Sequence, residues 1–292
     1  MQKNINIFII PLILLTFITQ AHARGSRPPE IKPPVEVPPT QTYPPQTGPY
    51  IDQIKALSSG SACEKKNWSG RGIAPTGYIK GVTLSFARSL CRLKTQSKVS
   101  AIMSAASTGK TGTDAVAYYQ SVFAAVPISV NVAGVEPLRA LYTLGIGLGM
   151  RESSGSYCEG WDKSAGARRP SSAGEAGAFQ TSYDSMALSY ELSNLYAEYK
   201  ESPERCFQDV FKVGVSCKPL NVLGTGPGAD YQIFNIACPA FATEYAMTML
   251  RLKRGHYGPI NRKEAQVASV CNDLLKNVQD LIENDPYACQ EI

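Results

Sequence analysis

Residues 138–155 have the sequence LRALYTLGIGLGMRESSG, in which an apolar run with three glycines ends in Arg-Glu-Ser-Ser-Gly. The apolar residues follow helical spacing, and Pro137 is well placed in the first turn of a helix that runs to about Arg151. Each glycine destabilises such a helix by about 1 kcal/mol relative to alanine. We therefore expect a buried helix that other backbone approaches closely, with Glu152 at its C-terminal end.

The predicted position of Glu152 is unfavourable for an ionised carboxylate. The helix dipole is negative at this end, and burial further disfavours the charged form. Both effects raise the pKa of a carboxyl group and keep it protonated near neutral pH, as a general acid for glycosidic cleavage requires. The alternative is that Glu152 pairs with Arg151 or another base and only closes the helix. Spacing alone does not decide between the two.

Two short segments, Glu152-Ser153-Ser154-Gly155 and Gly177-Ala178-Phe179-Gln180, together resemble the lysozyme superfamily. The similarity is to soluble lytic transglycosylases and goose-type lysozymes in particular, and also to a branch of predatory-bacterial lysozymes that act on deacetylated peptidoglycan. In the superfamily a Glu-Ser pair ends the central helix, and Gly-Leu-Met/Phe-Gln forms the floor of the cleft. Ala178 stands where the leucine is usual. The resemblance covers about residues 150–184, is looser to the end of the chain, and includes none of residues 24–84.

The resemblance implies a lysozyme-like catalytic domain of the muramidase type, which cleaves peptidoglycan glycan strands between N-acetylmuramic acid and glucosamine-type residues. Glu152 would protonate the leaving oxygen, and Ser153 and Gln180 would hold substrate or orient Glu152. Two outcomes stay open. A second carboxylate can activate water, which gives hydrolysis, or the muramic acid C6 hydroxyl attacks, which gives the 1,6-anhydro product of a lytic transglycosylase. Goose-type lysozymes have an aspartate where this chain has Ser182.

Four acidic residues near these segments are candidates for the second carboxylate: Glu159, Asp162, Glu175 and Asp184. A surface or loop position is the commoner state for each of them. If the substrate carries free amines, these carboxylates would instead pair with the glucosaminium cation. On this basis we predict Glu175 as a substrate-binding residue.

Aromatic residues near the same segments are candidate platforms for sugar stacking, although core packing is the commoner role of such rings: Tyr157, Trp161, Phe179, Tyr183 and Tyr231. Tyr231 is the strongest candidate, because the glycine-rich residues 224–230 before it predict an exposed, irregular loop. In the superfamily a tyrosine on the far wall frequently supports the catalytic glutamate.

Residues 1–23 have the pattern of a secretory signal peptide: a positive charge at Lys3, an apolar run from Ile5 to Ile18, and Ala21-His22-Ala23 at the cleavage site. The run is shorter than the ~20 apolar residues of a membrane span. We expect a periplasmic or secreted protein with no membrane contact after cleavage. Residues 24–49 contain four Pro-Pro pairs and predict an extended linker. Residues 50–292 then form the catalytic domain.

The eight cysteines all follow the signal peptide, as expected of a protein with up to four disulfides in an oxidising compartment. Their connectivity cannot be deduced, although Cys206 and Cys217 are close enough to close a local loop. No CxxC or Cys/His pair has the spacing of metal ligands, so we expect neither a metal nor another cofactor.

Helical spacing dominates the remaining chain and predicts a mainly α fold with an added N-terminal helical lobe. Helices are expected over residues 78–93, from an N-cap at Thr113-Asp114 to Phe123, over residues 238–252, and from an Asn261 cap to Ile282. A short pair of strands is expected around residues 128–132 and 212–215.

Charge and histidine content exclude other classes of protein. Removal of the signal peptide lowers the formal net charge from +5 to about +4, without the concentrated basic face of a nucleic-acid binder. His256 is then the one remaining histidine, which disfavours zinc amidases, zinc peptidases and Cys–His peptidases. A non-catalytic peptidoglycan-binding protein with a degenerate lysozyme fold remains the alternative. In either case we expect a monomer.

Overall fold

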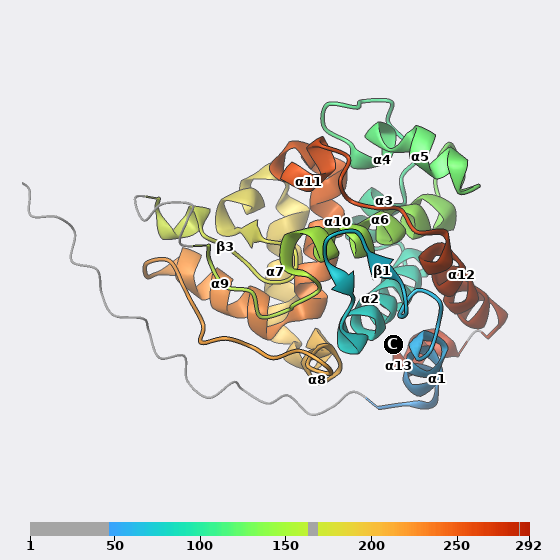
Figure 1. The fold of residues 1–292 in the computed structure, drawn as a ribbon, viewed down its shortest axis with the longest axis horizontal. Helices are drawn as coiled ribbons and strands as arrows, with labels where there is room; N and C mark the ends of the chain where they lie inside the picture. Colours follow the sequence, from blue (N-terminus) through green and yellow to red (C-terminus); the bar gives the residue numbers. More distant parts are fainter. Residues whose placement is uncertain (1–46, 163–168, 286) are drawn as a thin grey trace, which may run out of the picture. The chain divides into compact units, whose positions relative to one another are not determined.

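The computed structural model describes residues 47–162, 169–285 and 287–292. The predicted signal peptide and residues 24–46 of the predicted linker lie outside the described residues. All described residues belong to one compact unit, whose elements are labelled in Figure 1.

The described fold consists mainly of helices, which confirms the predicted class. The longer helices are α1 (Pro49–Ser58), α2 (Thr76–Lys94), α6 (Val135–Ser153), α7 (Tyr190–Glu201), α9 (Pro227–Ala237), α10 (Pro239–Leu252) and α12 (Ser269–Asn284). The shorter α-helices are α3 (Lys98–Ser104), α4 (Ala115–Tyr118), α5 (Gln120–Ala125), α8 (Gln208–Phe211), α11 (Gly258–Asn261) and α13 (Ala288–Glu291). The 3-10 helices are η2 (Ser171–Ala173), η3 (Tyr183–Leu188), η4 (Pro203–Cys206) and η5 (Arg254–His256).

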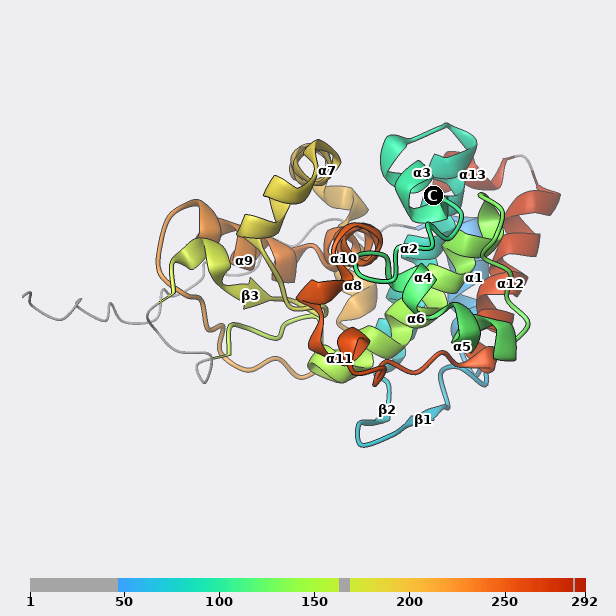
Figure 2. The ribbon, with the colours of Figure 1, turned by 90° about the horizontal axis from the view of Figure 1, so that it is seen from above.

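Strands contribute two small antiparallel hairpins to the described fold. In one, β1 (Asn67–Trp68) pairs with β2 (Gly72–Ile73), and this hairpin stands out from the helices in Figure 2. In the other, β3 (Glu175–Ala176) pairs with β4 (Thr181–Ser182), with Glu175 opposite Ser182. The predicted strands around residues 128–132 and 212–215 are wrong. The first is an extended segment whose Val130 carbonyl accepts a single hydrogen bond from Ser107, and the second is a turn that follows α8.

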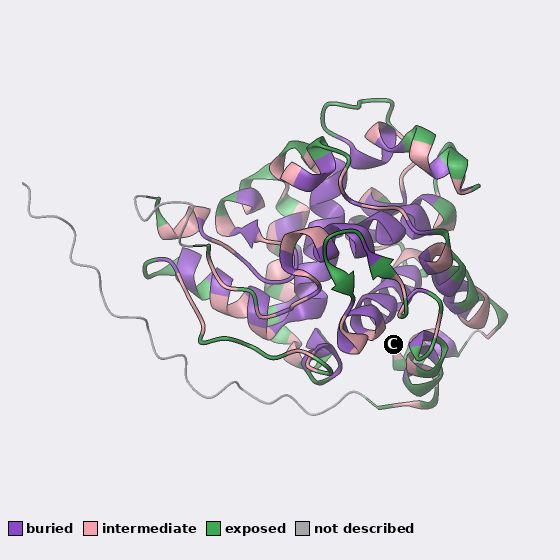
Figure 3. Ribbon diagram, viewed as in Figure 1, coloured by how far each residue is buried: buried purple, intermediate pink, exposed green. Residues whose placement is uncertain are grey.

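Helix α6 is the buried centre of the fold, in contact with α2, α3, α10 and α12. Every residue from Pro137 to Met150 is buried, and Figure 3 shows the helix in the colour of buried residues. The predicted close approach of other backbone is confirmed at Gly147, where a Cβ atom would overlap the Gln266 carbonyl oxygen. At Gly145 and Gly149 the space is filled by side chains, of Met247 and of Tyr78 with Phe179.

A tight backbone turn ends α6 directly after Ser153. Ser154 has a φ of 56° and Gly155 a φ of 77°, and their N–H groups donate to the carbonyls of Met150 (3.1 Å) and Gly149 (3.2 Å). A Cβ atom on Gly155 would lie 2.9 Å from the Tyr78 ring. This pair of hydrogen bonds to the last carbonyls is the common way in which a glycine closes a helix. Glu152 therefore lies in the last turn of a buried helix, as predicted.

The N-terminal segment is part of the same core rather than a separate lobe. Helix α1 packs against α2 and α12. Cys63 is disulfide-bonded to Cys271, and Cys91 to Cys289, so each bond joins the first part of the domain to its last helices.

Four disulfides use all eight cysteines, as the composition predicted. The suggested loop between Cys206 and Cys217 is wrong. Cys206 is fully buried at the end of η4, where it meets Cys238 at the start of α10 with the Cα atoms 4.4 Å apart. Cys217 is bonded instead to Cys158, which lies just beyond the end of α6.

The C-terminal helices differ from the prediction. Asn261 ends α11 and does not cap the last helix, which begins at Ser269. The residues between them are not helical, and in this segment the backbone at Gln266 packs directly on Gly147. The predicted cap at Asp114 is confirmed by its bond from the Val116 N–H (2.9 Å), although the helix is divided into α4 and α5 at Tyr119.

The glycine-rich residues 224–230 also differ from the prediction, because α9 begins within them at Pro227. Tyr231 is therefore a helical residue rather than part of an exposed loop. Among the described helices, none has both the length and the apolar character needed to cross a membrane.

The packing at Gly147 makes a prediction for stability. We expect Gly147→Ala to destabilise the protein by about 1–3 kcal/mol despite the better helix propensity of alanine, because the added methyl group would meet rigid backbone at Gln266. Urea unfolding with intact disulfides measures the difference. Gly145→Ala is the matched control, since its methyl group would meet the flexible end of Met247 and should cost less. Equal effects of the two substitutions would contradict the assigned packing.

Candidate active site

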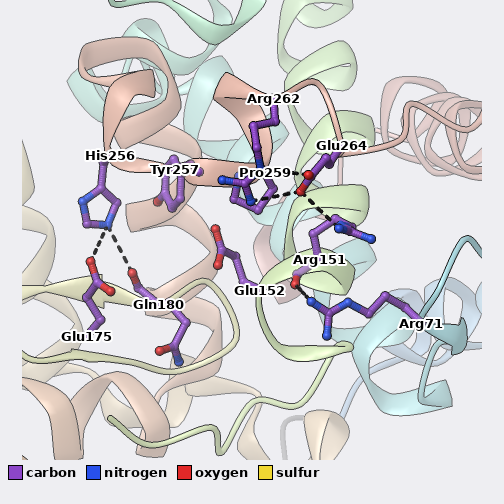
Figure 4. A pocket seen from close by; sticks show the side chains of 11 residues that line it. Arg71, Arg151, Glu152, Glu175, Gln180, His256, Tyr257, Pro259, Arg262 and Glu264 are labelled. Atoms are coloured by element: carbon purple, nitrogen blue, oxygen red, sulfur yellow. Dashed lines mark hydrogen bonds and ion pairs between the residues drawn. The ribbon is translucent and has the colours of Figure 1, made fainter. Parts of the chain in front are cut away.

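A pocket of about 340 Å³ lies at the C-terminal end of α6 (Figure 4). Its lining comes from the end of α6, the β1–β2 turn, the β3–β4 hairpin and the segment from η5 to residue 264. The lining residues are almost all polar or charged: Arg71, Arg151, Glu152, Glu175, Gln180, His256, Tyr257, Gly258, Pro259, Arg262 and Glu264.

The Glu152 carboxyl group lies in the pocket wall, and Figure 4 shows it pointing toward Tyr257. Burial raises its pKa to about 7, and the nearby carboxylate of Glu175 adds to the increase. Arg262, Arg71 and Arg151 oppose this shift because each positive charge favours the ionised form. The position at the negative end of α6 acts in the same direction as burial.

The structure does not contain the alternative ion pair between Arg151 and Glu152. Arg151 forms an ion pair with Glu264, with Nη2 and Oε2 3.1 Å apart. Among the described residues, no hydrogen bond or ion pair within 4 Å engages the Glu152 carboxyl group. Its interactions with the surrounding arginines act only over longer range, so neither of its oxygen atoms has a hydrogen-bond partner among the described residues.

The arginines on this side of the pocket are held by their own partners. Arg262 binds the Glu264 carboxylate with two nitrogen atoms, at 2.8 and 3.0 Å, and with Arg151 it lowers the pKa of Glu264 to about 2. Arg71 donates to the backbone carbonyl of Arg151 in the last turn of α6. Terminal carbonyls of a helix lack partners within the helix, so Arg71 both satisfies one of them and places positive charge at the helix end.

The β3–β4 hairpin forms another wall of the pocket and carries Glu175 and Gln180. Its tight turn requires left-handed backbone at Gly177 (φ 78°) and Gln180 (φ 48°). The Asn235 side chain in α9 stabilises the hairpin by donating to the Ala176 carbonyl (3.0 Å) and to Thr181 Oγ1 (2.7 Å). These bonds fix the two pocket residues relative to α9.

Ser153 has a structural position. Its hydroxyl donates to the carbonyls of Gly149 (3.1 Å) and Ala178 (2.9 Å) and does not line the pocket. It ties the end of α6 to the hairpin, so it orients the neighbouring Glu152 rather than contacting a ligand. The structure thus brings together three of the predicted site residues, namely Glu152, Glu175 and Gln180.

The predicted sugar platforms at Phe179, Tyr231 and Tyr157 are corrected by their burial. Phe179 is 1% exposed and fills the space beside Tyr78, and Tyr231 is completely buried, with its hydroxyl 2.8 Å from Thr181 Oγ1. Tyr157 is 6% exposed. These rings pack in the core because the segments that carry them are covered by neighbouring helices, so in this structure they offer no face to a sugar.

The other candidates for the second carboxylate do not line the pocket. Glu159, Asp162 and Asp184 are exposed. Glu175 is the one of the four that shares the pocket with Glu152. Burial raises the pKa of Glu175, while His256 and Arg169 act in the opposite direction and Asp162 adds to the increase.

The structure adds residues that the sequence did not identify as part of the site: Arg71, His256, Tyr257, Arg262 and Glu264. Tyr257 is 1% exposed, and its hydroxyl has no hydrogen-bond partner among the described residues. Burial and the nearby Glu152 carboxylate raise its pKa, so the hydroxyl is a neutral donor. Tyr257, rather than Tyr231, is thus the tyrosine that lines the pocket beside Glu152.

A signal for these residues is weak in the sequence. The segment RGHYGP at residues 254–259 has the glycine and proline of a turn, but no spacing relates it to Glu152, more than a hundred residues earlier.

The raised pKa of Glu152 predicts a pH-dependent stability. Because the folded state holds this proton up to about pH 7, whereas a free glutamate releases it near pH 4.5, stability falls as the pH rises between these values. We expect Glu152→Gln to be more stable than the wild type above pH 7, by up to about 3 kcal/mol, and close to it at pH 4. Urea unfolding at pH 4, 6 and 8 measures the difference. A difference that is the same at all three values would contradict the shift.

No protein-family model, no curated protein and no solved structure matches this chain.

Proposed function

We propose that this protein is an exported peptidoglycan glycosidase of the muramidase type, with Glu152 as its general acid. The observation that carries the proposal is the state of this carboxyl group. It lies in a pocket at the end of a buried helix, has a pKa of about 7, and has no ion-pair partner within 4 Å among the described residues. A general acid works best when its pKa lies near the operating pH.

The lining of the pocket supports a sugar substrate with acidic substituents. The amide of Gln180 is a hydrogen-bonding group suited to sugar hydroxyls, and Arg71 and Arg262 add positive charge. Peptidoglycan combines a hydroxyl-rich glycan with the carboxylates of its peptides and of muramic acid residues that carry no peptide. Four disulfides fit the oxidising compartments through which exported proteins pass, and peptidoglycan lies outside the cytoplasmic membrane. A periplasmic or secreted location is part of the proposal.

In the proposed reaction the protonated Glu152 donates its proton to the oxygen that bridges N-acetylmuramic acid and the next glucosamine-type residue. The bond from this oxygen to C1 breaks as positive charge develops on the sugar ring. Tyr257 faces the same carboxyl group and has an unused hydroxyl. It is placed to donate a hydrogen bond to Glu152 after the proton has left, which stabilises the carboxylate.

A second candidate, the lytic transglycosylase, is favoured by one observation. Ser182 stands at the position of the goose-type aspartate and carries no acidic group. It is buried, and its hydroxyl oxygen lies 3.2 Å from that of Ser185. In a transglycosylase a single glutamate suffices, since the muramic acid C6 hydroxyl takes the place of water.

Dye release from purified sacculi tests the general acid. We expect Glu152→Gln to lower the rate by about 10²–10⁴-fold, because the amide keeps the shape of the side chain but has no proton of suitable acidity. Glu159→Gln is the matched control, since that carboxylate is exposed and outside the pocket, and it should keep the wild-type rate. A wild type that is inactive on both acetylated and deacetylated sacculi would instead support the non-catalytic, peptidoglycan-binding alternative.

Mass spectrometry of the released fragments distinguishes the two reactions. We expect products that end in a reducing muramic acid and incorporate one oxygen atom from ¹⁸O-labelled water. Products that end in 1,6-anhydromuramic acid, without the label, would establish the transglycosylase.

A further inference from the structure

His256 and Glu175 form a pair on the wall of the pocket opposite the arginines (Figure 4). His256 ends η5, and Glu175 begins β3. The Nε2 atom of His256 lies 3.8 Å from Glu175 Oε1 and 3.1 Å from the Gln180 carbonyl oxygen. Two elements far apart in the sequence thus place an imidazole against the carboxylate that shares the pocket with Glu152.

The surroundings of His256 determine which of its nitrogen atoms carries the proton. Both groups near Nε2 are acceptors, a carbonyl and a carboxylate, so the neutral ring is assigned the tautomer with hydrogen on Nε2. The ring packs edge-on against Tyr257, with the centroids 4.8 Å apart and the planes at 83°. This packing and the bond to Gln180 hold the ring so that its N–H is directed at the β3–β4 hairpin.

The charges around Glu175 favour different protonation states for the two carboxyl groups, with Glu175 ionised and Glu152 protonated. Glu175 faces His256 and Arg169, which favour its ionised form, and Asp162 and Glu152, which disfavour it. Three arginines at longer range lower the pKa of Glu152, but burial is the largest influence on this pKa and raises it. When the two carboxyl groups share one proton, the imidazole of His256 beside Glu175 favours the state with the proton on Glu152. An acid and a base on facing groups are what hydrolysis of a glycosidic bond requires.

We propose that Glu175 is the base that activates the attacking water and that His256 is the residue that positions it; this inference rests on the proposed glycosidase activity. The proton of Glu152 passes to the leaving glycosidic oxygen as the bond from C1 to that oxygen breaks. The water oxygen bonds to C1 from the opposite face, and a proton of this water passes to Glu175. Exchange with solvent then returns one proton to Glu152 and removes one from Glu175, so water is the only co-reactant, and the configuration at C1 is inverted.

The role of Glu175 is tested with Glu175→Gln and Glu175→Ala on sacculi. Both should lower kcat by about 10²–10⁴-fold with little change in KM. Sodium azide or formate should restore much of the rate to Glu175→Ala, where a small anion fits the vacated space, but not to Glu152→Gln. Asp184→Asn is the control, because this exposed carboxylate does not line the pocket. Since rescue by an anion requires a folded site, failure of folding cannot imitate the expected result.

The role of His256 is tested with His256→Ala and His256→Gln. We expect His256→Ala to lower kcat by about 10–100-fold, as a misplaced catalytic group does. Its acidic limb in the pH profile of kcat/KM should move to higher pH, since the imidazole that lowers the pKa of Glu175 is lost. His256→Gln keeps an N–H donor and should retain more activity than His256→Ala, but with the same shift of the acidic limb. A merely structural histidine would leave this limb unchanged, and an unchanged limb overturns its assignment.

The outcomes separate this inference from the proposed function. Full hydrolysis by both Glu175 variants, together with loss of activity in Glu152→Gln, overturns the base while the glycosidase stands. Anhydro products, or retention of configuration at C1 as seen by NMR of early products, also overturn the base without affecting the general acid. An inactive wild type overturns the proposed function itself.

Discussion

The close contact between Gly147 in α6 and the backbone of Gln266 determines where the parts of the pocket lie. Because Gly147 has no Cβ atom, the segment after α11 can lie directly on the central helix. Glu264, just before this contact, then reaches Arg151 at the end of α6. The same segment continues back through α11, which also packs against α6, to Tyr257, so the wall that faces Glu152 lies directly on the helix that carries it.

The burial that this packing creates also raises the pKa of Glu152. A carboxyl group in the last turn of a buried helix is poorly solvated and lies in a negative field, so its pKa rises to about 7. Three arginines moderate the effect without forming a direct pair with Glu152. Ionisation of such a buried carboxyl group lowers the free energy of unfolding of the protein. Four disulfides, two of which join the first part of the domain to its last helices, constrain the unfolded chain and offset part of this cost.

The β3–β4 hairpin shows how residues outside the pocket maintain its geometry. Ser153 connects the end of α6 to the Ala178 carbonyl, and Asn235 connects α9 to both strands. The two residues fix the hairpin relative to α6 and α9, and thereby the positions of Glu175 and Gln180 opposite Glu152. Ser153, which a motif would assign to the substrate, is thus part of the support of the site.

The sequence by itself determined the mainly helical fold, the buried helix with Glu152 in its last turn, the close backbone approach at Gly147 and the use of all eight cysteines in disulfides. These follow from local spacing and composition, which act over a few neighbouring residues. Only the tertiary structure decided that Cys206 pairs with Cys238, that Tyr231 is buried, and that Tyr257 and His256 face Glu152 and Glu175. These depend on contacts between segments far apart in the chain, where helical periodicity states which face is buried but not which segment covers it.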